Sequence, residues 1–291
     1  MGRRGDWGTR SHSPIRPFTI LERRRRVRIL FVGDIVGKPG RQAAARLLPG
    51  LTEEFSPDFV IANGENAAGG MGITKDTASQ IFGAGVDAVT LGNHVWAKKE
   101  VYPYLNEEPR LVRPANYPAG VPGRGSAVFR TAGGDSIGVI CLCGRVFMDC
   151  LENPFTIADA LIETLAPESD VILVDFHAEA TSEKTAFGWY VDGRVGAVIG
   201  THTHVQTADE RILPGGTAYI TDVGMTGPAD SVIGVKKEII LSRFLTLMPS
   251  KFEVADGDGF LSAVVLDLDS STGKATGIER VQRTMSPSGG E

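Results

Sequence analysis

Short runs of apolar residues alternate along the chain with longer segments in which apolar residues recur every three or four positions. Apolar runs bounded by glycine or polar residues are typical of buried strands, and the wider spacing is typical of amphipathic helices. Strands are predicted over residues 27–33, 58–66, 86–94, 126–130, 136–143, 170–177, 195–204, 217–224 and 259–269. Helices are predicted over residues 41–55, 74–84, 156–166, 180–191 and 236–247. This alternation predicts an α/β fold.

Five of the predicted strands end in polar residues, in the segments FVGD, IANGEN, TLGNH, VDFH and VIGTHTH. In α/β sheets, ligands bind beyond the carboxyl ends of the strands, so we expect these clusters along one rim of one sheet system. Four of the five histidines of the chain belong to these clusters, namely His94, His177, His202 and His204. A single histidine after a strand is usually structural, but four together with nearby carboxylates indicate a functional cluster.

The residue types at these strand ends favour metal ions. Carboxylate, imidazole and amide oxygen are suitable ligands for Mn, Fe, Zn, Co or Ni, and no thiolate stands at a strand end. The candidate ligands are Asp34, Glu65, Asn66, Asn93, His177, His202 and His204. These are more donors than one tetrahedral ion needs, which favours two ions with a shared carboxylate, an arrangement that acts on phosphate esters. Two divalent ions with two carboxylates and one hydroxide keep about one positive charge, which attracts an anionic substrate.

His94 follows Asn93 directly, so its side chain is expected to point elsewhere in the pocket than a ligating Asn93. We predict that His94 is catalytic and donates a proton to the leaving oxygen when the ester bond breaks. The alternative is that His94 only forms a hydrogen bond with the phosphate.

The segment GDIVGKPG at residues 33–40 first suggests a phosphate-binding loop. A Walker A loop needs four residues between its glycines and a Ser or Thr after its lysine, whereas here three residues and Pro39 stand at those places. The H-x-H of residues 202–204 would also suit a metallo-β-lactamase-type hydrolase, but Gln206 and Thr207 stand where that pattern requires Asp and His. The segment is therefore interpreted through Asp34, as a metal ligand.

Three further residues lie near the clusters in the sequence. Lys184 follows His177 on a predicted helix, where it is expected to be a solvated lysine, with neutralisation of a phosphate as the alternative. Thr201 and Thr203 flank His202, and we expect them to orient the neighbouring histidines.

Composition limits the class of protein. The chain has 291 residues, of which 42% are hydrophobic, and no apolar run approaches the length that spans a bilayer, so no membrane partner is expected. Its three cysteines form neither an even set nor a C-x-x-C pair, which argues against a disulfide framework and favours a reduced cytoplasmic setting. The sequence leaves the oligomeric state open, with a homo-oligomer as one alternative.

Charge divides the chain into two unequal parts. Residues 1–26 carry eight arginines against Asp6 and Glu22, a net charge of +6, so the total of −5 leaves −11 for the rest. A body this acidic is a poor ligand for duplex nucleic acid, whose phosphates dominate binding. We interpret residues 1–26 as a disordered extension or as a start-site artefact with the natural start at Val27. Residues 27–284 are predicted to form a single domain, and residues 285–291 a frayed tail.

The order D … GEN … GNH … H … H-x-H resembles the calcineurin-like metallophosphoesterases, whose pattern is D-x-H … G-D … G-N-H-[DE] … H … G-H-x-H. The resemblance spans about residues 27–224. Two positions depart from it: Val36 stands where the family has a metal-binding histidine, and Glu65 where it has a bridging aspartate. These departures, with GDIVGKPGR, NGENAAGG and DFHAEATSEK, resemble the YmdB-like branch of bacterial metallophosphoesterases.

The resemblance implies a four-layer α/β/β/α sandwich with mixed sheets, and hydrolysis of phosphodiesters, 2′,3′-cyclic nucleotides in particular. It implies two divalent cofactor ions, with iron or manganese favoured and zinc compatible. It also implies how the ligands divide: Asp34, Glu65, Asn66 and His204 at the first ion, and Glu65, Asn93, His177 and His202 at the second. Asn66 would replace the missing histidine at the first ion.

The sequence therefore predicts an enzyme, a cytoplasmic metal-dependent phosphodiesterase acting on a small nucleotide phosphodiester. Two alternatives stay open. One is a nucleotide-sensing regulatory protein that keeps the metal pocket but turns over slowly, and the other is a phosphomonoesterase.

Overall fold

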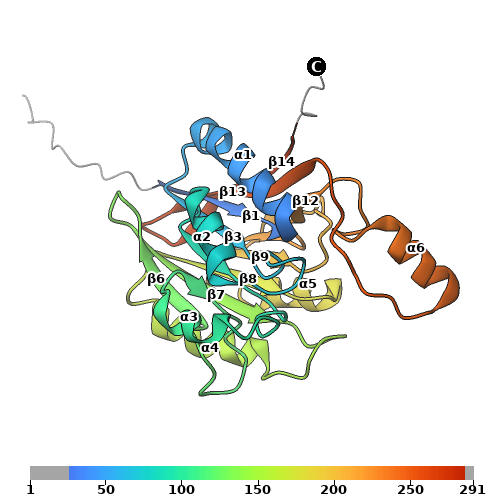
Figure 1. The fold of residues 1–291 in the computed structure, drawn as a ribbon. Coiled ribbons are helices and arrows are strands. Elements are labelled where there is room, and N and C mark those ends of the chain that lie inside the picture. The colour runs from blue at the N-terminus through green and yellow to red at the C-terminus, as the bar shows by residue number, and fades with distance from the viewer. Residues whose placement is uncertain (1–25, 286–291) are drawn as a thin grey trace, which may run out of the picture.

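The computed structural model describes residues 26–285, which form two β-sheets with helices on their outer faces (Figure 1). Of the predicted extension over residues 1–26 and the predicted tail over residues 285–291, residues 1–25 and 286–291 lie outside the described residues. Arg26 and Met285 both belong to the folded body. The Arg26 side chain contacts Asp267, and the backbone N–H of Met285 donates to the carbonyl oxygen of Gly259 over 2.9 Å.

The first sheet has eight strands in the order β2-β12-β13-β1-β3-β4-β5, with β14 paired to β13. Its strands are β1 (Arg26–Val32), β2 (Asp34–Ile35), β3 (Phe59–Asn63), β4 (Ala88–Thr90), β5 (Leu111–Val112), β12 (Met225–Pro228), β13 (Gly259–Asp269) and β14 (Lys274–Thr284). The strands β1, β3, β4 and β5 are parallel, whereas β13 runs antiparallel to β1, β12 and β14. The sheet is mixed, as predicted.

The second sheet has six strands in the order β10-β11-β9-β8-β7-β6. Its strands are β6 (Ser126–Arg130), β7 (Ser136–Cys143), β8 (Val171–His177), β9 (Ala197–Thr201), β10 (Arg211–Ile212) and β11 (Ala218–Ile220). The four inner strands are parallel, and the edge strands β6 and β10 are antiparallel to their neighbours. Because the inner strands are covered on both faces, they appear in the sequence as continuous apolar runs.

Three buried apolar clusters separate four layers. The helices α1 (Gly37–Phe55), α2 (Lys75–Gly83) and α3 (Val101–Glu107) cover the first sheet, and α4 (Pro154–Leu165) and α5 (Thr181–Tyr190) cover the second. The third cluster lies between the sheets. Alternate side chains of β1 show the arrangement, since Ile29 and Phe31 face the other sheet while Leu30 and Val32 face the helices. The predicted α/β/β/α sandwich is confirmed.

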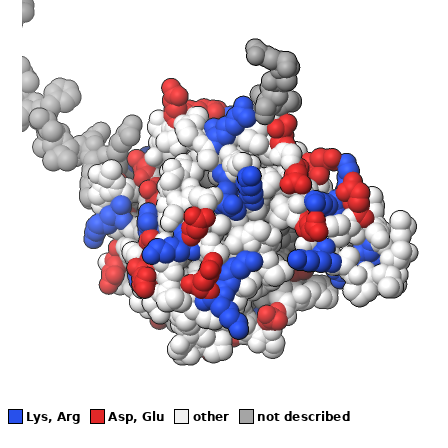
Figure 2. Space-filling view, viewed as in Figure 1, with Lys and Arg blue, Asp and Glu red and all other residues white. Residues whose placement is uncertain are grey.

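The helix α6 (Lys237–Thr246) stands apart from these layers. It extends from the body as part of an arm between β12 and β13 (Figure 1). Figure 2 shows acidic and basic side chains interspersed over the body, whereas the outer end of this arm is largely uncharged. Large apolar side chains are exposed there, namely Leu241, Phe244, Leu245, Leu247 and Met248. Among the described residues, no helix is long and apolar enough to cross a membrane.

Most strands with continuous apolar runs were predicted, as was the Thr74 cap, whose Oγ1 accepts from the backbone N–H of Thr77 over 3.2 Å. Four two- to four-residue strands and the helix α3 were missed. The eleven-residue strand β14 was missed too, because most of its side chains are exposed and carry no apolar run. Among residues 26–285 it pairs with one strand, β13, which supplies its hydrogen bonds.

Candidate metal centre

The polar strand ends of both sheets meet at one place. Asp34 stands in β2 just after β1, Glu65 and Asn66 follow β3, and Asn93 and His94 follow β4, all from the first sheet. His177 ends β8, and His202 and His204 follow β9, in the second sheet. The predicted single rim therefore consists of the adjoining edges of two stacked sheets. Direct contacts join all seven predicted ligands and His94.

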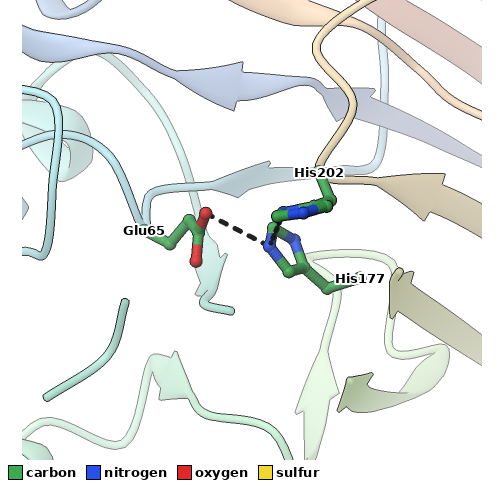
Figure 3. A group of neighbouring side chains, drawn as sticks. All are labelled: Glu65, His177 and His202. Carbon is green, nitrogen blue, oxygen red and sulfur yellow. Dashed lines mark hydrogen bonds and ion pairs between the residues drawn. The ribbon is translucent and has the colours of Figure 1, made fainter. Parts of the chain in front are cut away.

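Three of these side chains converge on Nε2 of His177. That nitrogen lies 3.1 Å from Oε1 of Glu65, 3.1 Å from Oδ1 of Asn93 and 3.0 Å from Nδ1 of His202. Figure 3 shows Glu65 and His202 both pointing toward the same nitrogen of His177. Donors that each bind one ion at ~2.1 Å and meet at a right angle lie about 3 Å apart, so these separations suit a shared ion.

A buried chain of hydrogen bonds sets the orientation of His177. The hydroxyl of Thr201 donates to Oδ1 of Asp175 over 2.6 Å, so it accepts from Nδ1–H of His177 over 2.8 Å. Asn63 donates to the other oxygen of Asp175 over 3.0 Å. The Nε2 atom of His177 is thus the nitrogen available to an ion, as in carboxylate-supported metal sites. The prediction for Thr201 is partly right, because it orients His177 rather than the histidine next to it.

The ionisation of this group fits a cation at its centre. Burial opposes protonation of His177, but Glu65 and the other carboxylates outweigh it and raise the pKa of the imidazole to about 9. Burial also opposes ionisation of Glu65, but contacts with His177 and His94 hold the pKa of that carboxyl well below its ordinary value. Burial and the nearby charge of His177 lower the pKa of His202 to about 3. A metal ion would replace the proton that His177 otherwise holds.

Asp34 and His204 form a second group beside the first. Asp34 is fully buried, its Oδ1 has no hydrogen-bond partner, and burial raises the pKa of the carboxyl to about 6. Nε2 of His204 lies 3.9 Å from that Oδ1, while Nδ1 of His204 lies 2.9 Å from the carbonyl oxygen of Ile233. The carbonyl can only accept, so Nδ1 carries the proton and Nε2 faces Asp34. Two electron-rich atoms with a gap between them again suit a cation.

Asn66 lies between the two groups. Its Nδ2 is 3.0 Å from Oε1 of Glu65 and 3.1 Å from Nε2 of His204, and its Oδ1 is 2.9 Å from Nδ1 of His94. The amide nitrogen therefore occupies the place between two would-be ligands. The two amide orientations have the same shape, and the opposite one turns Oδ1 toward Glu65 and His204.

Val36 occupies the position of the missing family histidine. It is buried, and a Cβ on Gly234 would lie only 2.7 Å from its Cγ1. Gly234 has a φ of 99°, a conformation that favours glycine. The Val36 side chain packs against Gly234, at the base of the arm between β12 and β13, and supplies no metal ligand.

Gly92 is required for the site to close. A Cβ added there would overlap Oε2 of Glu65 and the imidazole of His177. The GNH motif thus combines a ligand candidate with a position where only a hydrogen atom fits, which lets the backbone after β4 approach the cluster.

The backbone of the H-x-H segment has an unusual conformation. His202 and His204 have φ values of 96° and 68°, which non-glycine residues rarely adopt. The N–H of His202 donates to Oδ2 of Asp34 over 3.2 Å, and Thr203 donates its N–H and hydroxyl to Oδ2 of Asp222 over 3.0 and 2.7 Å. Thr203 therefore acts on the backbone between the histidines rather than on their rings.

Lys184 is the partner of Asp222, and the prediction of a solvated lysine was wrong. Its side chain is 1% exposed, and Nζ donates to Oδ2 of Asp222 and to the carbonyl oxygen of Thr201, each over 2.7 Å. It is occupied behind the site and is not free to neutralise a phosphate.

Glu179 and Asp222 are among the contributors to the site that sequence reasoning missed. Glu179 lies two residues after His177, and its Oε2 is 3.1 Å from Nε2 of His202. Asp222 belongs to an apolar run that ends in TDVG, the same signal that identified the other clusters, but without a histidine beside it. A cavity of about 370 Å³ opens beside Glu65, Asn66, His94, Glu179, His202 and His204.

A four-layer sandwich with this donor set at the shared edge of its sheets defines the metallophosphoesterase fold. The chain belongs to the YmdB-like family, whose sequence model matches residues 30–281. The predicted family membership is confirmed.

Relatives cover nearly the whole chain. A 2′,3′-cyclic-nucleotide 2′-phosphodiesterase of Bacillus subtilis is 53% identical over 255 residues, covering 88% of this chain and 96% of the relative. A putative phosphatase/phosphodiesterase of Mycoplasma genitalium is 36% identical over 265 residues, covering 88% and 92%. The prediction of an enzyme agrees with these names.

Two solved structures are similar throughout. A hypothetical protein of Thermus thermophilus superposes with a TM-score of 0.83 at 45% identity, over 89% of this chain and 99% of its own. A Mycoplasma pneumoniae protein described as a novel phosphatase superposes with a TM-score of 0.84 at 36% identity, over 90% and 95%.

Proposed function

We propose that the protein hydrolyses phosphodiester bonds with two divalent metal ions, and that 2′,3′-cyclic nucleotides are its substrates. The observation that carries the proposal is the buried Oδ1 of Asp34, which has no hydrogen-bond partner. An isolated buried carboxylate oxygen is costly, and a bound cation would remove that cost. The name of the Bacillus subtilis relative supports the class of substrate and the 2′ ester as the bond that breaks.

The two groups of donors suggest how the ions are held. The first ion would take Asp34, Glu65, Asn66 through its amide oxygen, and His204. The second ion would take Glu65, Asn93, His177 and His202, with Glu65 between the two. Oxygen and imidazole donors without thiolate support iron or manganese, with zinc compatible.

Bound ions would lower the pKa of a water molecule and neutralise charge on the phosphate. His94 would supply the proton that the leaving oxygen needs. Its Nδ1 lies 2.9 Å from the side-chain amide of Asn66 and is engaged with that amide in either orientation, so Nε2 is the nitrogen that can exchange a proton with substrate. The side chain is 30% exposed and lines the cavity, which supports access to substrate.

The test compares wild type with His94→Ala on two diesters in Mn²⁺ or Fe²⁺. Removal of a general acid costs roughly 10²- to 10⁴-fold in kcat on a 2′,3′-cyclic nucleotide. Bis(p-nitrophenyl) phosphate has a leaving group that needs no proton, so the loss there is expected to be much smaller. Equal losses on both esters at equal metal content would contradict the role of His94.

The same experiment separates the alternatives. A wild type that binds two metals but shows no turnover on either diester would favour a nucleotide-sensing protein. Faster hydrolysis of a nucleoside 3′-monophosphate than of the cyclic diester would favour a phosphomonoesterase.

We also propose a reducing, cytoplasmic setting, since Cys141, Cys143 and Cys150 are all unpaired.

A further inference from the structure

The cavity beside the metal centre has two unlike walls. One wall consists of the ligand candidates and His94, whereas the other is apolar and includes Met71, Ile233, Val235, Phe252 and Val254. Its volume of about 370 Å³ lies in the ordinary range of sites for small organic molecules, ~300–1,000 Å³. A phosphate held at the polar wall therefore leaves space in front of the apolar wall.

The apolar wall is held in place by packing at the base of the arm. Val235 forms isolated bridges with Val232 and Val254, and Lys236 lies 2.8 Å from Glu253. A Cβ on Gly70 would lie 2.7 Å from Val254, so the glycine allows the loop after β3 to approach the arm closely. The wall is thus a built surface between two segments that are distant in the sequence.

The arm base also contacts the metal centre directly. The carbonyl oxygen of Ile233 accepts from Nδ1 of His204, and Ile233 has a φ of 47°. A β-branched residue rarely adopts this conformation, so its presence beside a ligand candidate indicates a functional constraint. The apolar wall and the polar wall are therefore linked by one hydrogen bond.

Three members of this wall are exposed, namely Phe252, Met71 and Ile233. Phe252 and Met71 are each 47% exposed, and they come from the arm and from the loop after β3. The guanidinium carbon of Arg243 lies 4.8 Å from the centre of the Phe252 ring, which helps to hold the ring in place. An oriented aromatic ring that lines a cavity is a suitable surface for a flat heterocycle to stack on.

We propose that Phe252 and Met71 form a subsite for the base of the nucleotide whose phosphate lies at the metal centre. This inference rests on the proposed function. Because stacking accepts every base, the subsite selects nucleotides over esters without a base. Phe252 is then a specificity-determining residue of the site.

The test compares Phe252→Ala, Phe252→Trp and Phe244→Ala. Phe244 is 78% exposed on the same arm and is not part of the cavity lining, so it is a matched control. The substrates are adenosine 2′,3′-cyclic phosphate and methyl riboside 2,3-cyclic phosphate, which has no base. The measured quantity is the ratio of kcat/KM for the nucleotide to kcat/KM for the base-free ester.

In wild type this ratio is expected to be above roughly 10, and in Phe252→Ala it is expected to fall by about tenfold through a higher KM for the nucleotide. Phe252→Trp and Phe244→Ala should keep the wild-type ratio. Calorimetry should show that adenosine 3′-monophosphate binds to wild type, Phe252→Trp and Phe244→Ala more tightly than to Phe252→Ala. If wild type cleaves both esters with the same kcat/KM, or if the ratio is unchanged in Phe252→Ala, the subsite is overturned and the phosphodiesterase function still stands. A wild type that cleaves neither ester overturns both.

Discussion

Nζ of Lys184 lies 2.7 Å from Oδ2 of Asp222, and both side chains are buried directly behind the H-x-H segment. The same Asp222 oxygen accepts from the N–H and hydroxyl of Thr203, and the lysine also donates to the carbonyl oxygen of Thr201. One ion pair therefore holds the backbone on both sides of His202. Because that backbone has an unfavourable φ, its conformation depends on these contacts.

Lys184→Met is expected to destabilise the protein by about 3–5 kcal/mol, because it leaves the Asp222 carboxylate buried without its counter-charge. Metal affinity should fall as well, since His202 and His204 lose their anchored backbone. Urea unfolding of the metal-free protein and metal titration measure the two effects. The double variant Lys184→Met/Asp222→Asn removes the unpaired charge and should recover part of the stability. Wild-type stability in the single variant would contradict the role of the pair.

Thr201→Val keeps the shape of the side chain but breaks the link between His177 and Asp175. We expect metal affinity to fall by about 10–100-fold, the usual cost of losing the group that orients a ligating histidine. Competition with a chelator measures the affinity. Thr164→Val on the exposed face of α4 is the control, because its hydroxyl contacts only the helix backbone over 2.7 Å. Equal affinities in the two variants would argue against orientation of His177 through Thr201.

Metal binding is expected to release protons at neutral pH. The pKa of His177 in the metal-free protein is raised to about 9, so at pH 7 the imidazole carries a proton that the ion must displace. The pKa of Asp34 is raised to about 6, so a second proton is displaced below that pH. Metal affinity should therefore increase as pH rises from 5 to 9.

Calorimetry in two buffers of different ionisation enthalpy counts the protons released. About one proton is expected at pH 7, and more at pH 5.5. Binding that releases no proton at pH 7 would mean that His177 is already neutral or is not displaced by the ion. His177→Ala supplies the control, because it removes the group that is protonated at neutral pH.

Gly92→Ala is expected to abolish binding of the ion next to His177, because the added Cβ would overlap Glu65 and His177. Both of these side chains are buried, so neither can move aside without displacing its neighbours. Metal content of the purified variant measures the effect. Gly83→Ala is the matched control, since a Cβ there meets nothing within 4 Å and lies in the helix α2. A full metal complement in Gly92→Ala would refute the close fit.

Much of the fold and the site could be predicted because the relevant signals are local. A strand covered on both faces must be apolar along its length, so β7 and β8 could be located from their residues alone. The carboxyl ends of such strands gather at one edge, which is why His94 and His177 could be placed together before any contact was known.

Other features depend on partners that no local pattern encodes. Lys184 stands on a helix, where a lysine is usually solvated, and only the position of Asp222, 38 residues later, makes it a buried ion pair. The strand β14 is largely exposed, and its hydrogen bonds to β13 stabilise its extended conformation. The orientation of the Asn66 amide likewise depends on His94 and His204, which come from two different sheets.

The sequence by itself determined the alternation of strands and helices and the chemistry of the donors, because periodicity and residue type are properties of the residues in order. The four-layer arrangement followed from the resemblance to the metallophosphoesterases. Only the tertiary structure decided that Val36 packs into the arm, that Ile233 holds His204, and that Phe252 lines the cavity. Those contacts join residues from separate elements, and close packing settles which side chains meet only when all the layers are assembled.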